Sequence, residues 1–482
     1  MGRQEEGIYS SFPKVRDGRI RSIFWPSHIQ DLVMRGYHGV TKLTGRPFTV
    51  RWWAKDFLIL PPEVLPALRD ADWAHLSFFR TISDAFFLHT SVGNLYDSDE
   101  MVQVVRQGMN PRLPQLIPIL EDEISYALKA ELGDATGVSR TKSARDFLTA
   151  VVHRSASRIL VGEELCRDEA FIHESSGFVM SIFFTALIII KLPLGPLREW
   201  LAYPLSAWHR RKLARCADML MPVLEKRIAE WHNRDTNERP TPSSSLDSIE
   251  WFLMLSDEAV DKNRLAAELM HNLWAGTSAP GGLVTEIIFQ LLQQPQYKSP
   301  LLSESVEALR RSNGRWTEKA LSRLVLVDSF IRETNRLHPT GSITCSRTVL
   351  KHPLVLQGGL ELPVGTRFGF ATEAMQKDAD DTFDGFRYVG GPSADQSTST
   401  TVSPSNLAFG YGTHACPGRF FAIRLVKMVV MTLLLDYEIE WDGPPVAQRP
   451  EPLWIEGQYI PNGSQKIKIT RRLVSLRGEQ AA

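Results

Sequence analysis

The chain of 482 residues has few cysteines: Cys166, Cys216, Cys345 and Cys416. No two of them form a Cys-x-x-Cys pair, and no histidine stands at zinc-ligand spacing near any of them. The sequence therefore argues against a disulfide scaffold and against a zinc module, and it fits a reducing compartment.

An excess of charge of one sign is also lacking, since 55 Lys and Arg residues balance 55 Asp and Glu residues. Without a basic excess, we expect neither a general nucleic-acid binder nor an acidic-lipid binder. The composition, 43% hydrophobic and 23% charged, is that of a globular protein with a large core, which excludes disorder, collagen and coiled coil. Length alone leaves the number of domains open.

Long apolar runs are scarce. Residues 1–30 never build the continuous apolar stretch that a signal peptide or membrane anchor requires. The most apolar run, Gly177–Ile190, is closed by Lys191 and Pro193 before it reaches the ~18 to 20 residues that span a bilayer. We expect it to be a buried helix or a segment that dips into a membrane surface.

Helical periodicity dominates the rest of the chain, and strand-like segments are few. Helices are predicted over residues 115–132, 147–159, 208–231, 261–294, 317–337 and 417–435. Strands at 48–53 and 57–60 are expected to pair, as are 354–362 and 367–370 in a hairpin. Residues 233–248 and 390–405 have the composition of surface loops. The fold class is therefore mainly α with a small β-sheet region.

The most informative segment is Phe409-Gly-Tyr-Gly-Thr-His-Ala-Cys-Pro-Gly-Arg419, which an apolar helix follows. Gly410 and Gly412 permit a tight turn that brings backbone N–H groups close to the sulfur. Pro417 suits the first helical position, so we expect Cys416 at a helix N-terminus, where the dipole and unpaired N–H groups favour a thiolate. Such a thiolate is either a metal ligand or a nucleophile.

A nucleophile would need a positioned base, and His414 is the candidate, although no third residue to orient it is evident. For a single cysteine, a buried structural role is the common alternative. The eleven-residue context argues for a ligand instead. Its pattern, Phe-Gly-x-Gly-x-His-x-Cys-x-Gly, resembles the haem-ligand signature of the cytochrome P450 family at every defining position.

This resemblance implies a heme b cofactor whose iron has the Cys416 thiolate as its axial ligand. It places Phe409 against the haem, with Gly410 and Gly418 in the ligand loop, and it implies a hydrogen bond between His414 and a haem propionate.

Four further cations carry implications of the same kind. Arg347 matches the position of a propionate-binding arginine in the family. Arg419, Arg424 and Lys427 on the following helix would face an acidic redox partner or form an ordinary solvated face.

Glu333 and Arg336 stand one helical turn apart, near enough to pair. Alone, such a pair is usually a surface salt bridge of little worth. Ahead of the cysteine motif, it resembles the family's Glu-x-x-Arg pair, with Arg387 in Phe383-Asp-Gly-Phe-Arg387 as the third member. The resemblance then implies a buried structural ion network that supports the haem pocket.

The resemblance covers nearly the whole chain and is to filamentous-fungal members of secondary metabolism, through residues 48–60, 157–167 and 412–422. It implies the cytochrome P450 fold, with the haem between a long kinked distal helix and the cysteine-loop helix. A single domain over 31–475 would follow a segment, 1–30, without anchor and precede a tail, 476–482. Besides the missing anchor, the segment between Met375 and Phe383 is shorter than in the family.

The predicted helix over 261–294 contains Trp274-Ala-Gly-Thr-Ser-Ala-Pro-Gly-Gly282. Pro280 has no N–H, and its ring would meet the carbonyl of Gly276, so we expect a kink with an opened turn. In the family, the distal helix carries Ala/Gly-Gly-x-acid-Thr, where the opened turn receives O₂ and the acid and threonine relay protons. Ala275 and Gly276 match that pattern.

The next residues depart from it, because Ser278 and Ala279 stand where the acid and threonine are expected. Thr277, Ser278 or an ordered water would have to deliver protons, or a substrate hydroxyl would do so. The missing threonine at Ala279 also keeps open a redox-neutral haem-thiolate isomerase or cyclase. A catalytically silent haem protein, acting as a sensor or carrier, is a third alternative.

We expect a haem-dependent monooxygenase that uses O₂ and electrons from an NADPH–cytochrome P450 reductase, since no dinucleotide-binding fingerprint is present. The resemblance implies a lipophilic terpenoid, polyketide or alkaloid intermediate as substrate. Its pocket would be largely apolar, with Leu273, Trp274 and Thr277 in the roof and residues 340–344 in a wall. A monomer at the endoplasmic reticulum membrane surface inside the cell, touching the bilayer through residues 178–197, is implied as well.

Overall fold

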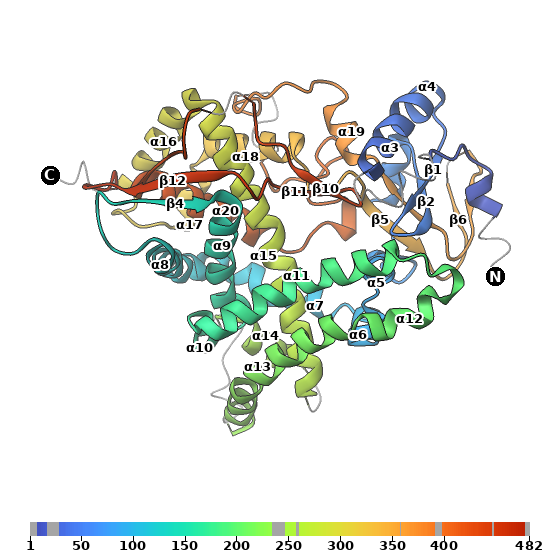
Figure 1. Ribbon diagram of the computed structural model, residues 1–482, viewed down its shortest axis with the longest axis horizontal. Helices are drawn as coiled ribbons and strands as arrows, with labels where there is room; N and C mark the ends of the chain where they lie inside the picture. Colours follow the sequence, from blue (N-terminus) through green and yellow to red (C-terminus); the bar gives the residue numbers. More distant parts are fainter. Residues whose placement is uncertain are drawn as a thin grey trace.

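The computed structural model describes residues 7–16, 28–233, 246–256, 260–356, 358–390, 398–445 and 448–477. They form a mainly helical protein with small sheets, as expected (Figure 1). Most of the N-terminal segment 1–30, most of the loop 233–248, about half of the loop 390–405 and the tail from residue 478 lie outside the described residues.

Most of the predicted helices are confirmed. They are α8 (Leu113–Leu132), α9 (Ala144–Leu160), α13 (Ala207–Asn233), α15 (Lys262–Gln293) and α20 (Arg419–Asp436). Further helices are α3 (His28–Gly36), α5 (Phe78–Phe86), α7 (Glu100–Gln103), α11 (Glu169–Lys191), α12 (Arg198–Leu205), α14 (Ser248–Leu255), α16 (Lys298–Arg310) and α19 (Thr372–Lys377).

The prediction of one helix over 317–337 is wrong, because the chain forms α17 (Glu318–Ser322) and α18 (Val325–Leu337) instead. The carboxylate of Glu304 accepts hydrogen bonds from the N–H groups of Leu326 at 2.8 Å and Val327 at 3.0 Å. These bonds satisfy donors that a continuous helix would have paired internally, and so they give α18 an N-terminus of its own.

The largest sheet has the strand order β1-β2-β8-β5-β3. The antiparallel pair β1 (Phe48–Trp52) and β2 (Lys55–Ile59) confirms the first predicted pairing. The predicted hairpin of 354–362 with 367–370 is wrong. Instead, β6 (Leu354–Val355) pairs antiparallel with β7 (Glu361–Leu362), and Gly358 and Gly359 lie between them at positive φ.

The strand β8 (Arg367–Phe370) instead lies between β2 and β5 (Thr344–Val349), where Phe368 and Phe370 are buried. The remaining strands are β3 (Leu76–Ser77), β4 (Ser139–Ser143), β9 (Tyr437–Trp441), β10 (Leu453–Ile455), β11 (Gln458–Ile460) and β12 (Lys466–Arg471). Of these, β3 lies at the edge of the largest sheet, next to β5. The strands β4, β12 and β9 form a second sheet in that order, and β10 pairs with β11.

The helix α15 runs through the middle of the molecule and packs against α9, α13, α18 and α20 (Figure 1). It continues without interruption through Pro280. Its glycines allow α9 to approach closely: a Cβ on Gly276 would lie 2.7 Å from Leu160 Cδ1, and one on Gly281 would lie 3.1 Å from Thr149 Cα. Packing against α9 therefore offsets the low helix propensity of this segment.

The helix α11 contains the apolar run and extends beyond it to 23 residues, which is long and apolar enough to cross a membrane by length and composition. About 44% of that apolar window is buried inside the protein, and α11 packs against α13. Its outer face is exposed at Met180, Phe184 and Ile188, and the exposed apolar surface continues through Trp200 of α12.

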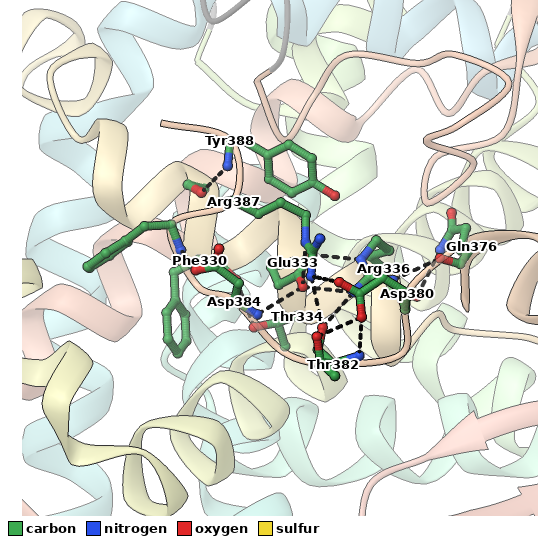
Figure 2. Close-up of polar contacts among 12 residues, drawn as sticks. Phe330, Glu333, Thr334, Arg336, Gln376, Asp380, Thr382, Asp384, Arg387 and Tyr388 are labelled. Atoms are coloured by element: carbon green, nitrogen blue, oxygen red, sulfur yellow. Dashed lines mark hydrogen bonds and ion pairs between the residues drawn. The ribbon is translucent and has the colours of Figure 1, made fainter. Parts of the chain in front are cut away.

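The buried carboxylate of Glu333 joins the two arginines that the sequence pairs with it (Figure 2). Arg336 donates to it from Nε at 2.7 Å and from Nη2 at 2.8 Å, and Arg387 donates from Nε at 3.0 Å. Arg387 also donates to Asp380, at 2.8 Å. The predicted ion network is therefore present, and it ties α18 to the segment that follows α19.

The network extends to the chain that leads into the cysteine motif. Arg336 donates to the carbonyl oxygens of Gln376 and Thr382, each at 2.9 Å. The Gln376 side chain in turn donates to the Arg336 carbonyl at 3.1 Å and accepts from the Leu407 N–H at 3.0 Å. Because Leu407 is two residues before Phe409, α18 fixes the start of the cysteine loop.

We predict that Glu333→Gln destabilises the protein by about 3 to 5 kcal/mol, because two largely buried guanidinium groups lose their shared counter-ion. The free energy of unfolding, measured in urea at pH 7, checks this. Asp380→Asn is the matched control: that carboxylate contacts the same Arg387 but is 38% exposed, so its loss should shift the urea midpoint far less. Equal shifts for the two variants would contradict the assigned role of Glu333.

Candidate functional site

The loop around Cys416 is closed by its own backbone. The Cys416 N–H donates to the Phe409 carbonyl at 2.8 Å, and the turn between them uses Gly410 at φ +77° and Gly412 at φ +65°. A Cβ on Gly412 would lie 2.0 Å from the Arg69 carbonyl oxygen. The two glycines thus form the expected tight turn, and the close backbone approach at Gly412 is to Arg69 rather than to the sulfur.

The start of α20 differs from the sequence-based expectation. Pro417 is not the first helical residue, since Gly418 is the N-cap and α20 begins at Arg419. Cys416 therefore precedes the helix by one short turn, and the N–H groups of Gly418 and Arg419 are hydrogen-bonded to its sulfur. This arrangement still aims two unpaired helix donors at the sulfur.

Burial nevertheless raises the pKa of the Cys416 thiol above its ordinary value, against the lowering by those two N–H groups and by the Arg419 charge. In the protein alone, desolvation of the sulfur thus outweighs the two N–H groups, whereas the sequence predicts a thiolate favoured by the helix N-terminus. Cys416 is also accessible, whereas Ala415 beside it is buried. Both observations fit a sulfur that lines an interior space.

A positive cluster, formed by Arg106 and Arg347 together with the neutral side chains of His414 and Trp73, lies beside this loop. Arg106 Nη2 donates to the Thr413 carbonyl at 2.7 Å, and its guanidinium lies 5.5 Å from the Trp73 ring. The Trp73 ring stacks on His414 with centroids 4.4 Å apart. Burial lowers the pKa of Arg347 to about 10, and burial together with the Arg347 charge lowers that of His414 to about 3.

The cluster has donors that the described part of the chain does not satisfy. Arg347 is buried and donates to the Ser346 carbonyl, but no described carboxylate pairs with it or with Arg106. The buried Trp73 Nε1–H is a donor without a partner among the described residues, and the buried His414 Nδ1, also without one, becomes a donor only when the ring is protonated. His414 Nε2 is occupied by the Ala71 carbonyl at 3.1 Å. Such a set suits an anionic group.

The distal helix α15 presents an accessible face at Ala275, Ser278 and Ala279, although its other faces are largely buried. Ser278 Oγ donates to the Trp274 carbonyl at 3.0 Å. Thr277 lies on a buried face and donates to the Leu273 carbonyl at 2.8 Å. Of the two candidate relay residues, the structure therefore brings only Ser278 to the accessible face.

Two of the three basic residues on α20 are used internally. Lys427 is buried and pairs with Asp328 at 2.6 Å, and Arg424 donates to Glu318 at 2.8 Å. Both expectations for Lys427, a place on a solvated face and a contact with a redox partner, are therefore wrong, because the side chain is buried. Arg419 donates to the Cys416 carbonyl at 2.8 Å and so belongs to the loop itself.

Sequence reasoning did not identify Arg106 and Trp73. They are 33 residues apart, and neither stands in a recognisable motif. Only the fold, which stacks Trp73 on His414, brings them to the cysteine loop. A basic and an aromatic residue at unrelated positions carry no periodic signal from which their association could be predicted.

The residues present fit a haem group. Among the described residues, no three His, Cys, Asp or Glu side chains gather to hold a metal ion. A metal held by Cys416 must therefore bring most of its own ligands, as haem iron does. The positive cluster with its unsatisfied donors matches the carboxylates that a haem carries.

Comparison with known proteins agrees with this geometry. Residues 96–462 match the family model described as Cytochrome P450. The chain is 34% identical to cytochrome P450 monooxygenase sirB of Leptosphaeria maculans, over 91% of this chain and 86% of that protein. It is 31% identical to cytochrome P450 monooxygenase penP of Penicillium crustosum, over 88% and 80%.

A solved structure, the retinoic acid-bound cyanobacterial CYP120A1, has a similar fold. Its TM-score is 0.69 at 15% identity, covering 95% of this chain and 99% of that one. The family match, these relatives and the fold agree: the chain belongs to the cytochrome P450 family and is an oxygenase enzyme.

Proposed function

We propose that the protein oxidises a lipophilic small molecule, a terpenoid, polyketide or alkaloid intermediate of fungal secondary metabolism, using O₂ and electrons from an NADPH–cytochrome P450 reductase. The observation that carries this proposal is the accessible Cys416 sulfur, held by two N–H groups ahead of α20. The monooxygenase relatives support it and argue against a silent haem protein.

Heme b would be held by Cys416 as the axial ligand, with Phe409, Gly410 and Gly418 shaping the loop. When bound, haem supplies the activation of O₂. Arg347 would hold one of its carboxylates. His414 carries its proton on Nε2, facing Ala71, so its Nδ1 can bind a carboxylate only once protonated, which a nearby anion favours by raising the pKa.

On the distal side, the small residues Ala275 and Gly276 leave space beside α15. The Ser278 hydroxyl has a proton that it can pass on. Its hydroxyl donates to the Trp274 carbonyl and retains lone pairs that can accept from a water. Thr277, the other candidate, is buried and would act through the helix backbone. We therefore assign proton delivery to Ser278 together with water.

We further propose a single domain over 31–475 that works as a monomer at the endoplasmic reticulum membrane surface. The support is the exposed apolar surface of α11 and α12, at Met180, Phe184, Ile188 and Trp200. Amphipathic surfaces of this kind bury apolar side chains at the headgroup boundary. No nucleic-acid partner is proposed.

A redox-neutral isomerase or cyclase is the second candidate, and one observation favours it. The accessible face of α15 has Ala279 where the family has its relay threonine, so a hydroxyl is missing at that position. Such an enzyme would rearrange an oxygenated substrate without net oxidation and would need no reductase for turnover.

We predict that incubation of host metabolite extract with the haem-loaded protein, reductase, NADPH and ¹⁸O₂ yields a product that carries one ¹⁸O atom. Mass spectrometry of the extract measures the label, and reactions with Cys416→Ala protein or without NADPH serve as controls. An unlabelled new product that forms equally well without NADPH would replace this proposal by the isomerase or cyclase.

We predict that Ser278→Ala lowers the yield of product per NADPH consumed by about tenfold or more, because productive O–O cleavage needs a delivered proton. Thr285→Ala is the matched control on the same helix, since Thr285 also donates to its own helix backbone, at 2.9 Å to Gly281. Coupling that is unchanged in Ser278→Ala would mean that water or substrate delivers the proton without this residue.

A further inference from the structure

Two buried histidines meet on the N-terminal side of the accessible α15 face. His271 lies one turn before Ala275 on α15, and His209 comes from α13. Figure 1 shows α11 crossing near both helices, and α13 packs against α15. Each histidine is only 2% exposed, and their ring centroids are 6.4 Å apart at an interplanar angle of 77°.

Hydrogen bonds fix the tautomer of His209. The Ser181 hydroxyl has one proton, which it donates to the Phe178 carbonyl at 2.6 Å. Ser181 Oγ must therefore accept from His209 Nδ1, at 2.9 Å. With its proton on Nδ1, neutral His209 has a bare lone pair on Nε2, and that buried atom has no partner among the described residues.

His271 has the complementary tautomer. Its Nδ1 lies 2.6 Å from the Tyr96 hydroxyl, and no other acceptor for that hydroxyl proton is found among the described residues. When Tyr96 donates to Nδ1, the proton of neutral His271 is on Nε2. This Nε2–H is likewise buried without a partner in the described chain.

Burial keeps both rings neutral, lowering the pKa of His271 to about 3 and that of His209 to about 4. No hydrogen bond joins the two rings directly. The buried donor at His271 Nε2 and the buried acceptor at His209 Nε2, on rings whose centroids are 6.4 Å apart, are thus both left unsatisfied among the described residues, at a cost that a bridging group would remove.

We propose that the His209–His271 pair binds a hydroxyl group of the substrate, which accepts from His271 Nε2–H and donates to His209 Nε2. This inference rests on the proposed oxidation of a lipophilic small molecule and narrows its class to lipophilic alcohols. A ketone or ether can only accept and would leave His209 unpaired, an ammonium group can only donate, and a carboxylate brings a charge that neutral rings do not balance.

The surroundings suit an alcohol whose remaining surface is apolar. Phe178 stacks on His209 with centroids 5.2 Å apart, and its ring is T-shaped to that of His271 with centroids 5.6 Å apart. Trp274, one turn nearer the accessible face, contacts His271 at 6.1 Å. Aromatic side chains therefore pack against both imidazole rings, an arrangement in which a hydrogen-bonding group can fix the orientation of an apolar ligand.

Binding of probe alcohols to the haem-loaded protein tests this proposal without turnover. Farnesol, menthol and sclareol are each titrated by calorimetry beside their methyl ethers, which cannot donate. We expect the alcohols that bind to do so about tenfold more tightly than their ethers, because the ether leaves a buried acceptor unpaired. The preference should vanish in His209→Phe and in His271→Phe.

His153→Phe is the matched control, because His153 is also buried and neutral but has its Nε2 satisfied by Ser175, at 2.8 Å. It should keep the preference for alcohols. A milder variant, Ser181→Ala, removes the acceptor of His209 Nδ1, so the proton moves to Nε2 and the site gains a second donor. Menthone should then bind more tightly than menthol.

The proposal is overturned if the wild type shows no preference for alcohols, or if the preference survives both His→Phe variants. The two unpaired Nε2 atoms would then be assigned to an ordered water only. Because no NADPH or reductase is used, that result would leave the proposed monooxygenation standing. If the ¹⁸O₂ experiment gives a labelled product but no alcohol preference is found, the monooxygenation proposal stands and only the hydroxyl-binding proposal fails.

Discussion

The carboxylate of Glu333 is the interaction on which the site depends. It is wholly buried and lies between the guanidinium groups of Arg336 and Arg387 (Figure 2). Through Gln376, the same arrangement holds Leu407 and hence the beginning of the cysteine loop. A buried ion pair contributes little net stability, but it is strongly destabilising to break, so it specifies one arrangement of segments far apart in the sequence.

The ion network around Glu333 positions the Cys416 sulfur. The surroundings of that sulfur favour the neutral thiol over the thiolate. Although Cys416 is accessible, desolvation of its sulfur raises its pKa, and the two N–H groups at the start of α20 offset only part of that effect. Arg106 and Arg347, the charged members of the positive cluster, lack carboxylate partners among the described residues. A cationic metal for the sulfur and anionic groups for the cluster would complete both, and haem brings both in one molecule.

Local patterns predicted most of the helices, the glycine turn at Gly410 and Gly412, and the partners of Glu333, because each depends on residues close in sequence or on a motif. Long-range contacts decided the rest. The break before α18 needs Glu304 from another helix, and the raised pKa of Cys416 needs the burial that the whole fold creates. The His209–His271 pair joins residues 62 positions apart, which no spacing rule connects.

The central claim is that Cys416 is the ligand of a haem iron. The most direct measurement is the carbon monoxide difference spectrum of the reduced, haem-loaded protein, compared with that of Cys416→His. We expect the wild type to give the red-shifted Soret band of a thiolate-ligated haem and the variant to give the band of a nitrogen-ligated haem. The same spectrum from both proteins would contradict the account, because the iron would then have another ligand.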